Sequence, residues 1–134
     1  MASTVPFKLI TPTEVVFEGD AELVIAVGTE GEEGILPRHA PFLTALRPGI
    51  LRANTSGGRL ELATGEGFMQ ALPDRVTVLV DRALRFEDVN PAAARSELNE
   101  ALERQKGAPD AAEFSREQAI IDFANAKLRL TGHH

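Results

Sequence analysis

The sequence contains no cysteine, tryptophan or tyrosine, and only three of its 134 residues are histidine. Without cysteine, the chain cannot form disulfides, thiolate metal sites or a cysteine nucleophile. Without tryptophan and tyrosine, it lacks the aromatic platforms on which carbohydrates and single-stranded nucleic acids stack. These absences exclude several classes of enzyme and binding protein before any motif is considered.

Long apolar runs are absent as well, since no run approaches the roughly 20 residues that cross a bilayer. No secretory signal or transit peptide is readable in Met1–Pro6, so we expect a bacterial cytoplasmic protein. With 43% hydrophobic and 25% charged residues, the composition is that of a soluble globular protein. The net charge of −6 repels phosphate backbones, which argues against nucleic acid as a partner.

Short strands separated by turn residues dominate the first two thirds of the chain. They recur about every eight to ten residues, a spacing typical of a β-sandwich or barrel. The segment Gly28–Gly34 is interpreted as a turn region. The pattern predicts ten strands, at residues 5–10, 14–18, 21–27, 35–36, 42–46, 50–53, 59–63, 68–72, 75–80 and 82–86.

After Phe86 the apolar pattern changes to the helical period. Asn90-Pro91 supplies an N-cap and a first-turn proline, which predicts a helix that ends at Lys106-Gly107. A second amphipathic helix starts at either Asp110 or Ser115, because both positions can form a capping box. The predicted fold is therefore mainly β with α: a ten-stranded β-sandwich in residues 1–86, followed by an antiparallel α-helical hairpin in residues 87–134.

The apolar stripes of both predicted helices are thin and rich in alanine. The expected stripes are Ala94, Leu98, Ala101 and Leu102 on the first helix and Phe114, Ile121, Ala124 and Leu128 on the second. At about 25 cal/mol per Å² of buried apolar area, burial of such a seam stabilises the hairpin by only a few kcal/mol. The conformational entropy lost on ordering the hairpin opposes this gain. The hairpin is then either conditionally docked, and so a candidate switch, or permanently packed on the sandwich; the residues leave both possibilities open.

The segment from Gly28 to Gly49 contains most of the candidate catalytic or metal-binding side chains, but their pattern does not predict an enzyme. Its three carboxylates lack the alternating spacing of a calcium loop, which favours a solvated acidic turn. His39 has no nucleophile or zinc motif beside it, and we interpret it as an anchor or a partner contact. Gly65-x-Gly67 indicates a tight turn, and no function is assigned to His133-His134. We expect no catalytic residues, cofactor or metal.

Three stretches resemble a known family. They are Leu9–Pro12 with Val16–Gly19, the segment GTEGEEGILPRHAPFLTALRPG at Gly28–Gly49, and Val76–Val80. These stretches are similar to the epsilon subunit of bacterial F-type ATP synthases. The resemblance covers most of residues 5–86, whereas the predicted hairpin matches that family by architecture more than by sequence.

The resemblance implies a non-catalytic rotor subunit of the central stalk, which couples the gamma subunit to the c-ring in proton-driven ATP synthesis. It places Gly31, Glu32 and Glu33 against the polar loops of the c-ring. It places His39, Thr44 and Arg47 at the gamma interface. It also implies a hairpin that can lie folded against the sandwich or extend toward the alpha and beta subunits, where it inhibits ATP hydrolysis. The implied location is peripheral, on the cytoplasmic face of the bacterial inner membrane, without direct membrane insertion.

The chain departs from this family at the start of the first predicted helix. Some members bind ATP through an Ile/Leu-Asp-x-x-Arg-Ala motif, but here the corresponding stretch is Val89–Ala94, with Asn90 and Ala93 in place of the aspartate and the arginine. Arg95 stands two positions later, about 200° around a helix. We therefore predict no ATP binding, or very weak binding. Weak inhibition is also expected, because Glu117 and Asp122 offset the cations of the second helix.

One alternative function remains open. The chain could be a free-standing β-sandwich that senses a small molecule through its helical hairpin. A small hydrolase is disfavoured, because no nucleophile and base can be paired in this sequence. Co-purification with gamma and the c-ring would separate a rotor subunit from a free-standing sensor.

Overall fold

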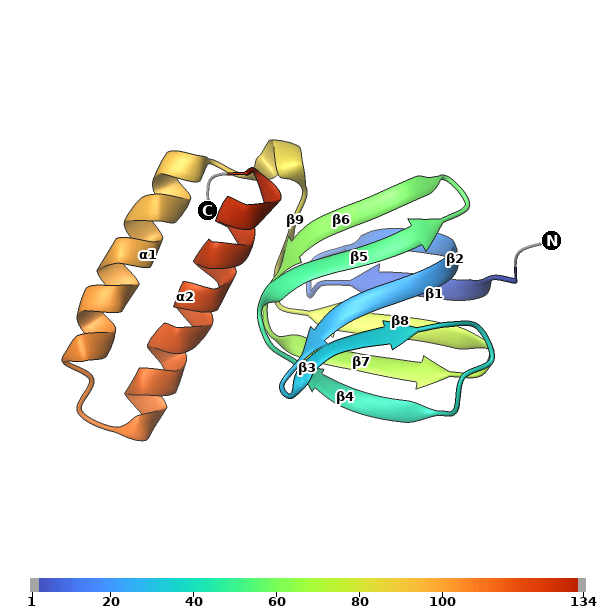
Figure 1. Cartoon of the computed structure of the whole chain (residues 1–134), viewed down its shortest axis with the longest axis horizontal. Coiled ribbons are helices and arrows are strands. Elements are labelled where there is room, and N and C mark those ends of the chain that lie inside the picture. Colours follow the sequence, from blue (N-terminus) through green and yellow to red (C-terminus); the bar gives the residue numbers. More distant parts are fainter. Residues whose placement is uncertain (1–2, 133–134) are drawn as a thin grey trace.

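The computed structural model describes residues 3–132, so the terminal pair His133-His134 lies outside the described residues. Figure 1 shows two parts, a sandwich of β-strands and a pair of antiparallel helices beside it. The strands are β1 Val5–Ile10, β2 Val15–Gly28, β3 Gly31–Ile35, β4 Phe42–Leu46, β5 Gly49–Thr55, β6 Gly58–Thr64, β7 Gly67–Leu72, β8 Arg75–Val80 and β9 Ala83–Leu84. The prediction of a mainly β chain with a helical hairpin is therefore confirmed.

The predicted count of ten strands is wrong, because nine form within residues 3–132. The segments 14–18 and 21–27 were expected to be separated by a turn at Gly19-Asp20. Instead, these two residues pair with Phe7 and Pro6 of β1, and β2 runs through them for 14 residues. Gly19 carries no side chain, and the ring of Phe17 packs in the space beside it, with its centroid 5.6 Å from that of Phe7.

Two further boundaries differ from the sequence-based prediction. The acidic segment Gly28–Gly34 is not an open turn: β3 starts at Gly31, and Gly28 pairs with Gly31 across a two-residue hairpin turn. Gly31 has a φ of +129°, a conformation that glycine adopts without steric cost. The predicted strand 82–86 is reduced to β9, which is followed by a short 3₁₀ helix at Phe86–Asp88.

β2 connects the two layers of the sandwich. Its first half pairs with β1, which continues into a layer of β8, β7 and β4, while its second half pairs with β3 and β5, followed by β6 and β9. The core between the layers is aliphatic and contains one phenylalanine and one methionine that are almost fully buried. It comprises Val5, Phe7, Leu9, Ala21, Val24, Ala26, Ile35, Leu46, Leu51, Ala53, Leu62, Met69, Ala71, Val76, Val78 and Val80.

The helices are α1 Pro91–Lys106 and α2 Ala111–Leu130. The expected cap at Asn90 is confirmed, since its side chain accepts a hydrogen bond from the backbone of Ala93 at 3.1 Å. The open choice for the second helix is settled in favour of Asp110, whose side chain accepts from the amide of Glu113 at 2.8 Å. In the part of the chain that the structure covers, neither helix is long and apolar enough to span a membrane.

The seam between the helices is apolar at its centre and polar elsewhere. Ala94, Leu98 and Ala101 of α1 pack against Ile121, Ala124 and Leu128 of α2. Arg104 and Glu117 form an ion pair at 2.9 Å across the seam. Phe114 and Leu102, which were expected in the stripes, are 50% and 40% exposed. The apolar stripe is thus shorter than the sequence predicted.

The hairpin packs on the sandwich through α2. Phe123 and Ala126 of this helix form a small buried cluster with Ala63 of β6, and Ile50, Leu84 and Leu130 pack around it. α2 therefore buries residues on two sides, one against α1 and one against the sandwich. This arrangement places one end of β5 and of the β2–β3 hairpin beside α2 (Figure 1).

Candidate partner-docking site

The outer face of the β4–β7–β8–β1 layer carries a continuous apolar row. Its members are register neighbours on successive strands: Ala45 pairs with Phe68, Phe68 with Leu79, Leu79 with Ile10, and Ile10 with Val15. Side chains of a strand alternate between the two faces of a sheet, and the residues beside these in sequence fill the core. We call the five residues, together with Leu43 two positions from Ala45, the apolar row.

Four members of the apolar row are more than half exposed, whereas most hydrophobic residues of the sandwich are buried. Phe68, Leu79, Leu43 and Val15 are 56%, 52%, 67% and 51% exposed. A shallow groove of about 290 Å³ runs beside it, lined by Ile10, Pro12, Phe68 and Leu79 among others. Single exposed hydrophobic residues are common, but a contiguous patch marks a surface that another molecule covers. The row therefore has the chemistry of a docking surface.

The three residues assigned to a gamma interface do not lie together. His39 precedes β4 and Arg47 follows it, so the two stand at opposite ends of a five-residue strand. Thr44 lies between them, but it pairs with the fully buried Met69 and faces the core side of β4, away from the apolar row. Of the three, His39 has a local anchor: its Nδ1 donates to the carbonyl of Ala40 at 2.7 Å, and its ring stands edge-on to Phe42 at 5.8 Å.

Gly31, Glu32 and Glu33, the residues assigned to the c-ring contact, are brought together at the start of β3. Glu32 is exposed and accepts a hydrogen bond from Nη2 of Arg52 at 2.8 Å. This end of the β2–β3 hairpin borders a cleft against α2. The acidic segment is therefore a rigid, hydrogen-bonded edge of the sheet, not a free loop.

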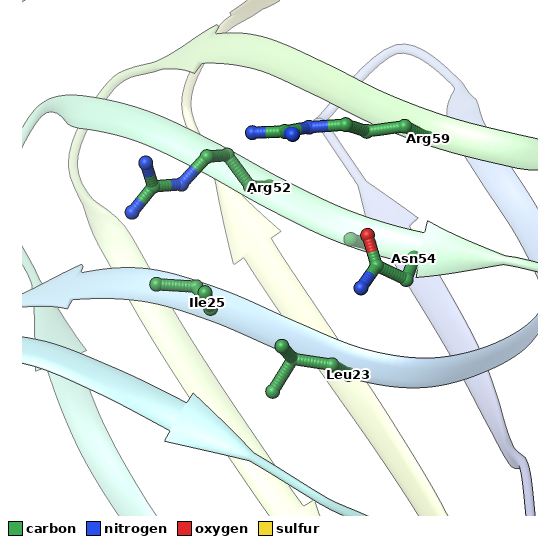
Figure 2. A pocket seen from close by; sticks show the side chains of 6 residues that line it. Leu23, Ile25, Arg52, Asn54 and Arg59 are labelled. Carbon is green, nitrogen blue, oxygen red and sulfur yellow. The ribbon is translucent and has the colours of Figure 1, made fainter.

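The opposite layer of the sandwich offers a different outer surface. A hollow of about 260 Å³ is lined by Leu23, Ile25, Arg52 and Arg59, together with Ala53 and Asn54. Figure 2 shows the side chains of Arg52 and Arg59 extending in the same direction from two neighbouring strands, with Leu23 and Ile25 on the next strand. Arg59 is paired with Glu61 at 3.3 Å. This surface is mixed and charged, in contrast to the apolar row.

The residues of the degenerate ATP motif contribute to capping and not to a binding site. Asn90 caps α1, and Ala93 is exposed and provides the capped amide. Nearby, the ammonium group of Lys127 is held by both carboxylate oxygens of Glu97 at 3.0 Å. Among residues 3–132, no group of three acidic or histidine side chains is placed to hold a metal ion.

Sequence reasoning missed the apolar row. The signal was present: in Val76–Val80 and Leu9–Ile10, apolar residues occupy both faces of strands in which alternation would leave one face polar. Such runs are also typical of strands buried on both sides, and only the pairing of five strands reveals that these residues line one outer face.

Comparison with known proteins identifies the protein family of this chain. Residues 4–86 match the family model described as the β-sandwich domain of the ATP synthase delta/epsilon chain. The chain is 40% identical over 130 residues to the ATP synthase epsilon chain of Halorhodospira halophila, with 95% of this chain and 92% of that relative covered. The chain thus belongs to the ATP synthase delta/epsilon chain family, and the relationship extends through the helical hairpin.

Solved structures share the fold. A chain in the cryo-EM structure of the Euglena gracilis mitochondrial ATP synthase, which contains OSCP, F1 and the c-ring, matches with a TM-score of 0.80 and 21% identity, covering 97% of this chain and 82% of that one. A chain in the central stalk and c-ring structure of the Tetrahymena thermophila mitochondrial ATP synthase matches with a TM-score of 0.62 and 16% identity, covering 96% and 97%. At these identities the similarity establishes the architecture alone.

Proposed function

We propose that this chain is a non-catalytic central-stalk subunit of an F-type ATP synthase, and that its apolar row docks on the gamma subunit. The observation that carries the proposal is the exposed line of Phe68, Leu79 and Leu43 on a sandwich whose other hydrophobic residues are largely buried. The choice of ATP synthase as the complex rests on family membership, since the relative from Halorhodospira halophila is an ATP synthase epsilon chain. Burial of these side chains provides most of the docking free energy.

His39 supports this assignment from the margin of the surface. Its Nδ1 atom carries the proton, because it donates to a carbonyl oxygen. Its Nε2 atom is then an acceptor, and it is buried without a hydrogen-bond partner among the described residues. Because this chain itself covers the Nε2 atom, His39 supports docking as a ring packed beside Phe42 and not through a hydrogen bond from Nε2 to gamma. Thr44 contributes through the packing of β4, and Arg47 contacts gamma at the far end of that strand.

The proposal extends to the c-ring contact, the hairpin and the location of the protein. Residues 1–86 form the head that joins gamma to the c-ring during proton-driven ATP synthesis, with Gly31, Glu32 and Glu33 at the c-ring loops. Residues 87–134 form a regulatory hairpin that restrains ATP hydrolysis when it reaches the alpha and beta subunits. The protein then works on the cytoplasmic face of the bacterial inner membrane, as a peripheral member of the complex.

Co-purification tests the docking proposal. A tagged form of the full chain is co-expressed with the gamma subunit, and gamma is expected to be retained by the native chain and lost with Phe68→Asp. Phe114→Asp is the matched control, because Phe114 is equally exposed but lies on the hairpin. Retention of gamma by Phe68→Asp would contradict the docking site. Failure of the native chain to retain gamma would contradict the function and favour a free-standing ligand sensor.

Deletion of residues 88–134 tests the regulatory role separately. The ATPase rate of the reconstituted complex is expected to rise modestly, because the cations of α2 are largely engaged: Lys127 pairs with Glu97, and Arg116 with Glu113. An unchanged rate would contradict inhibition by the hairpin while leaving the docking proposal intact.

A further inference from the structure

A second cleft lies where the sandwich meets the hairpin. It has a volume of about 500 Å³ and is bordered by the end of the β2–β3 hairpin, the turn between β4 and β5, and the last turns of α2. It lies apart from the degenerate ATP motif, which is at the start of α1. Its polar lining comprises Arg47, Arg52, Arg129, Asn125, Glu32 and Asp122.

The charge of this cleft is opposite to that of the protein. The chain carries a net charge of −6, yet the cleft holds three arginines against two carboxylates. Asp122 already accepts a hydrogen bond from Gln118 at 2.9 Å, and Glu32 is engaged by Arg52. Within the described part of the chain, Arg47 and Arg129 form no ion pair. Two guanidinium groups are thus free to bind an anion.

Arg52 points to the same conclusion. One of its terminal nitrogens binds Glu32, but its Nε atom is buried and has no hydrogen-bond partner among residues 3–132. The chain itself covers the Nε atom, so the group that Arg52 offers to an anion in the cleft is its second terminal nitrogen, Nη1, which forms no hydrogen bond or ion pair within residues 3–132. Guanidinium groups bind carboxylate and phosphate through paired hydrogen bonds, which favours an oxyanion over a halide.

We propose that this cleft binds an inorganic polyphosphate such as pyrophosphate, held by Arg47 and Arg52 of the head and Arg129 of α2. The volume exceeds what one phosphate group fills, and three guanidinium groups suit a ligand with more than one phosphate. The apolar lining is aliphatic, provided by Val27, Pro48 and Ile50. With no aromatic ring in the lining, the cleft lacks the aromatic surface on which a nucleotide base commonly stacks.

Occupation of this cleft has a mechanical consequence. The proposed ligands come from both parts of the chain, two from the head and one from the hairpin. An anion that binds all three arginines therefore binds the docked hairpin more tightly than a detached one. By linkage, pyrophosphate would favour the docked state. All three arginines belong to this chain, so the site is tested on the isolated protein; in the proposed complex, Arg47 would be shared with the gamma contact.

Titration of the full chain with sodium pyrophosphate at low ionic strength tests the site. Calorimetry is expected to show saturable binding, with sodium chloride at matched ionic strength as the blank. Arg129→Gln and Arg47→Gln are each expected to weaken the affinity about tenfold, as the loss of a charge-assisted hydrogen bond does. Both side chains are exposed, so both variants should keep the native fold. Pyrophosphate should also raise the thermal midpoint of the native chain more than that of Arg129→Gln.

Arg59→Gln is the matched control. Arg52 borders both this cleft and the hollow in Figure 2, whereas Arg59 borders only the hollow. Arg59→Gln is expected to leave pyrophosphate binding unchanged. Loss of affinity in Arg59→Gln with none in Arg129→Gln would place the anion in the hollow and overturn the proposal, as would the absence of saturable binding. ATP that binds tenfold more tightly than pyrophosphate would overturn the assignment to an inorganic ligand.

Discussion

The guanidinium carbon of Arg82 lies 4.3 Å from the centroid of the Phe123 ring, and this contact joins the head to the hairpin. The ammonium nitrogen of Lys127 lies 4.8 Å from the same ring. Phe123 is 2% exposed, although it belongs to a helix whose other apolar face packs on α1. One buried aromatic side chain thus packs between the two parts and attracts two cations.

Replacement of Phe123 is therefore expected to detach the hairpin while the head stays folded. Phe123→Ala removes a buried ring from a cluster whose other core members are alanines, a loss of about 3–5 kcal/mol by comparison with similar substitutions. Limited proteolysis should then cut the segment between β9 and α1 in the variant much faster than in the native chain. Phe114→Ala serves as the control, because Phe114 is half exposed and should change nothing. Equal protection of all three chains would contradict this account of the junction.

The ion pair between Lys127 and Glu97 gives an asymmetric prediction. The Lys127 side chain is 8% exposed and that of Glu97 is 43% exposed, so removal of the carboxylate leaves a nearly buried ammonium group with its main partner gone. Glu97→Ala is expected to lower the free energy of unfolding by about 1–3 kcal/mol. Lys127→Met, which removes the buried charge and keeps the aliphatic chain, should cost less. Urea unfolding measures both, and a larger loss in Lys127→Met would contradict the interpretation.

Gly67 is expected to tolerate no side chain. A Cβ atom at this position would lie 1.7 Å from the carbonyl oxygen of Leu79 and 2.7 Å from Cα of Val80, and backbone atoms of a paired strand cannot move aside. Gly67→Ala should separate β7 from β8 and cost more than about 3 kcal/mol, above the usual range of single substitutions. Gly57→Ala, at an open turn, is the control. Similar thermal midpoints for the two variants would show that the strands are less closely paired than described.

ATP is expected to bind the isolated protein very weakly. Asn90 and Ala93 replace the charged residues of the family's motif, and both are engaged in the cap of α1. Lys127 is occupied by Glu97, so it offers no free ammonium group to a phosphate. Isothermal titration should give no micromolar affinity. A micromolar dissociation constant would mean that other residues compensate for the missing aspartate and arginine.

The sequence predicted those elements that depend on local patterns. The cap at Asn90, the glycine after α1 and the alternation in β8 are encoded by residues close in the chain, whereas the choice between Asp110 and Ser115 as the second cap needed the structure. The continuous β2 strand could not be predicted, because Gly19-Asp20 has the composition of a turn and becomes a strand only through its pairing with β1. Long-range pairing overrode the local preference.

The two surfaces on which the proposals rest were also beyond local reasoning. The apolar row depends on the register of five strands, and the arginine cleft combines residues separated by more than seventy positions, such as Arg52 and Arg129. The buried position of Phe123 was missed for a similar reason, since α2 packs on two partners and a single apolar stripe does not describe it.

Cysteine labelling most directly tests whether the apolar row docks on gamma. The native chain has no cysteine, so Leu79→Cys and Asn54→Cys each introduce one reactive thiol, on opposite outer faces of the sandwich. The rate of maleimide labelling is measured for each variant with and without the gamma subunit. We predict that gamma slows labelling at position 79 by at least tenfold and leaves position 54 unchanged. Protection at position 54, with position 79 still reactive in the complex, would contradict the central claim.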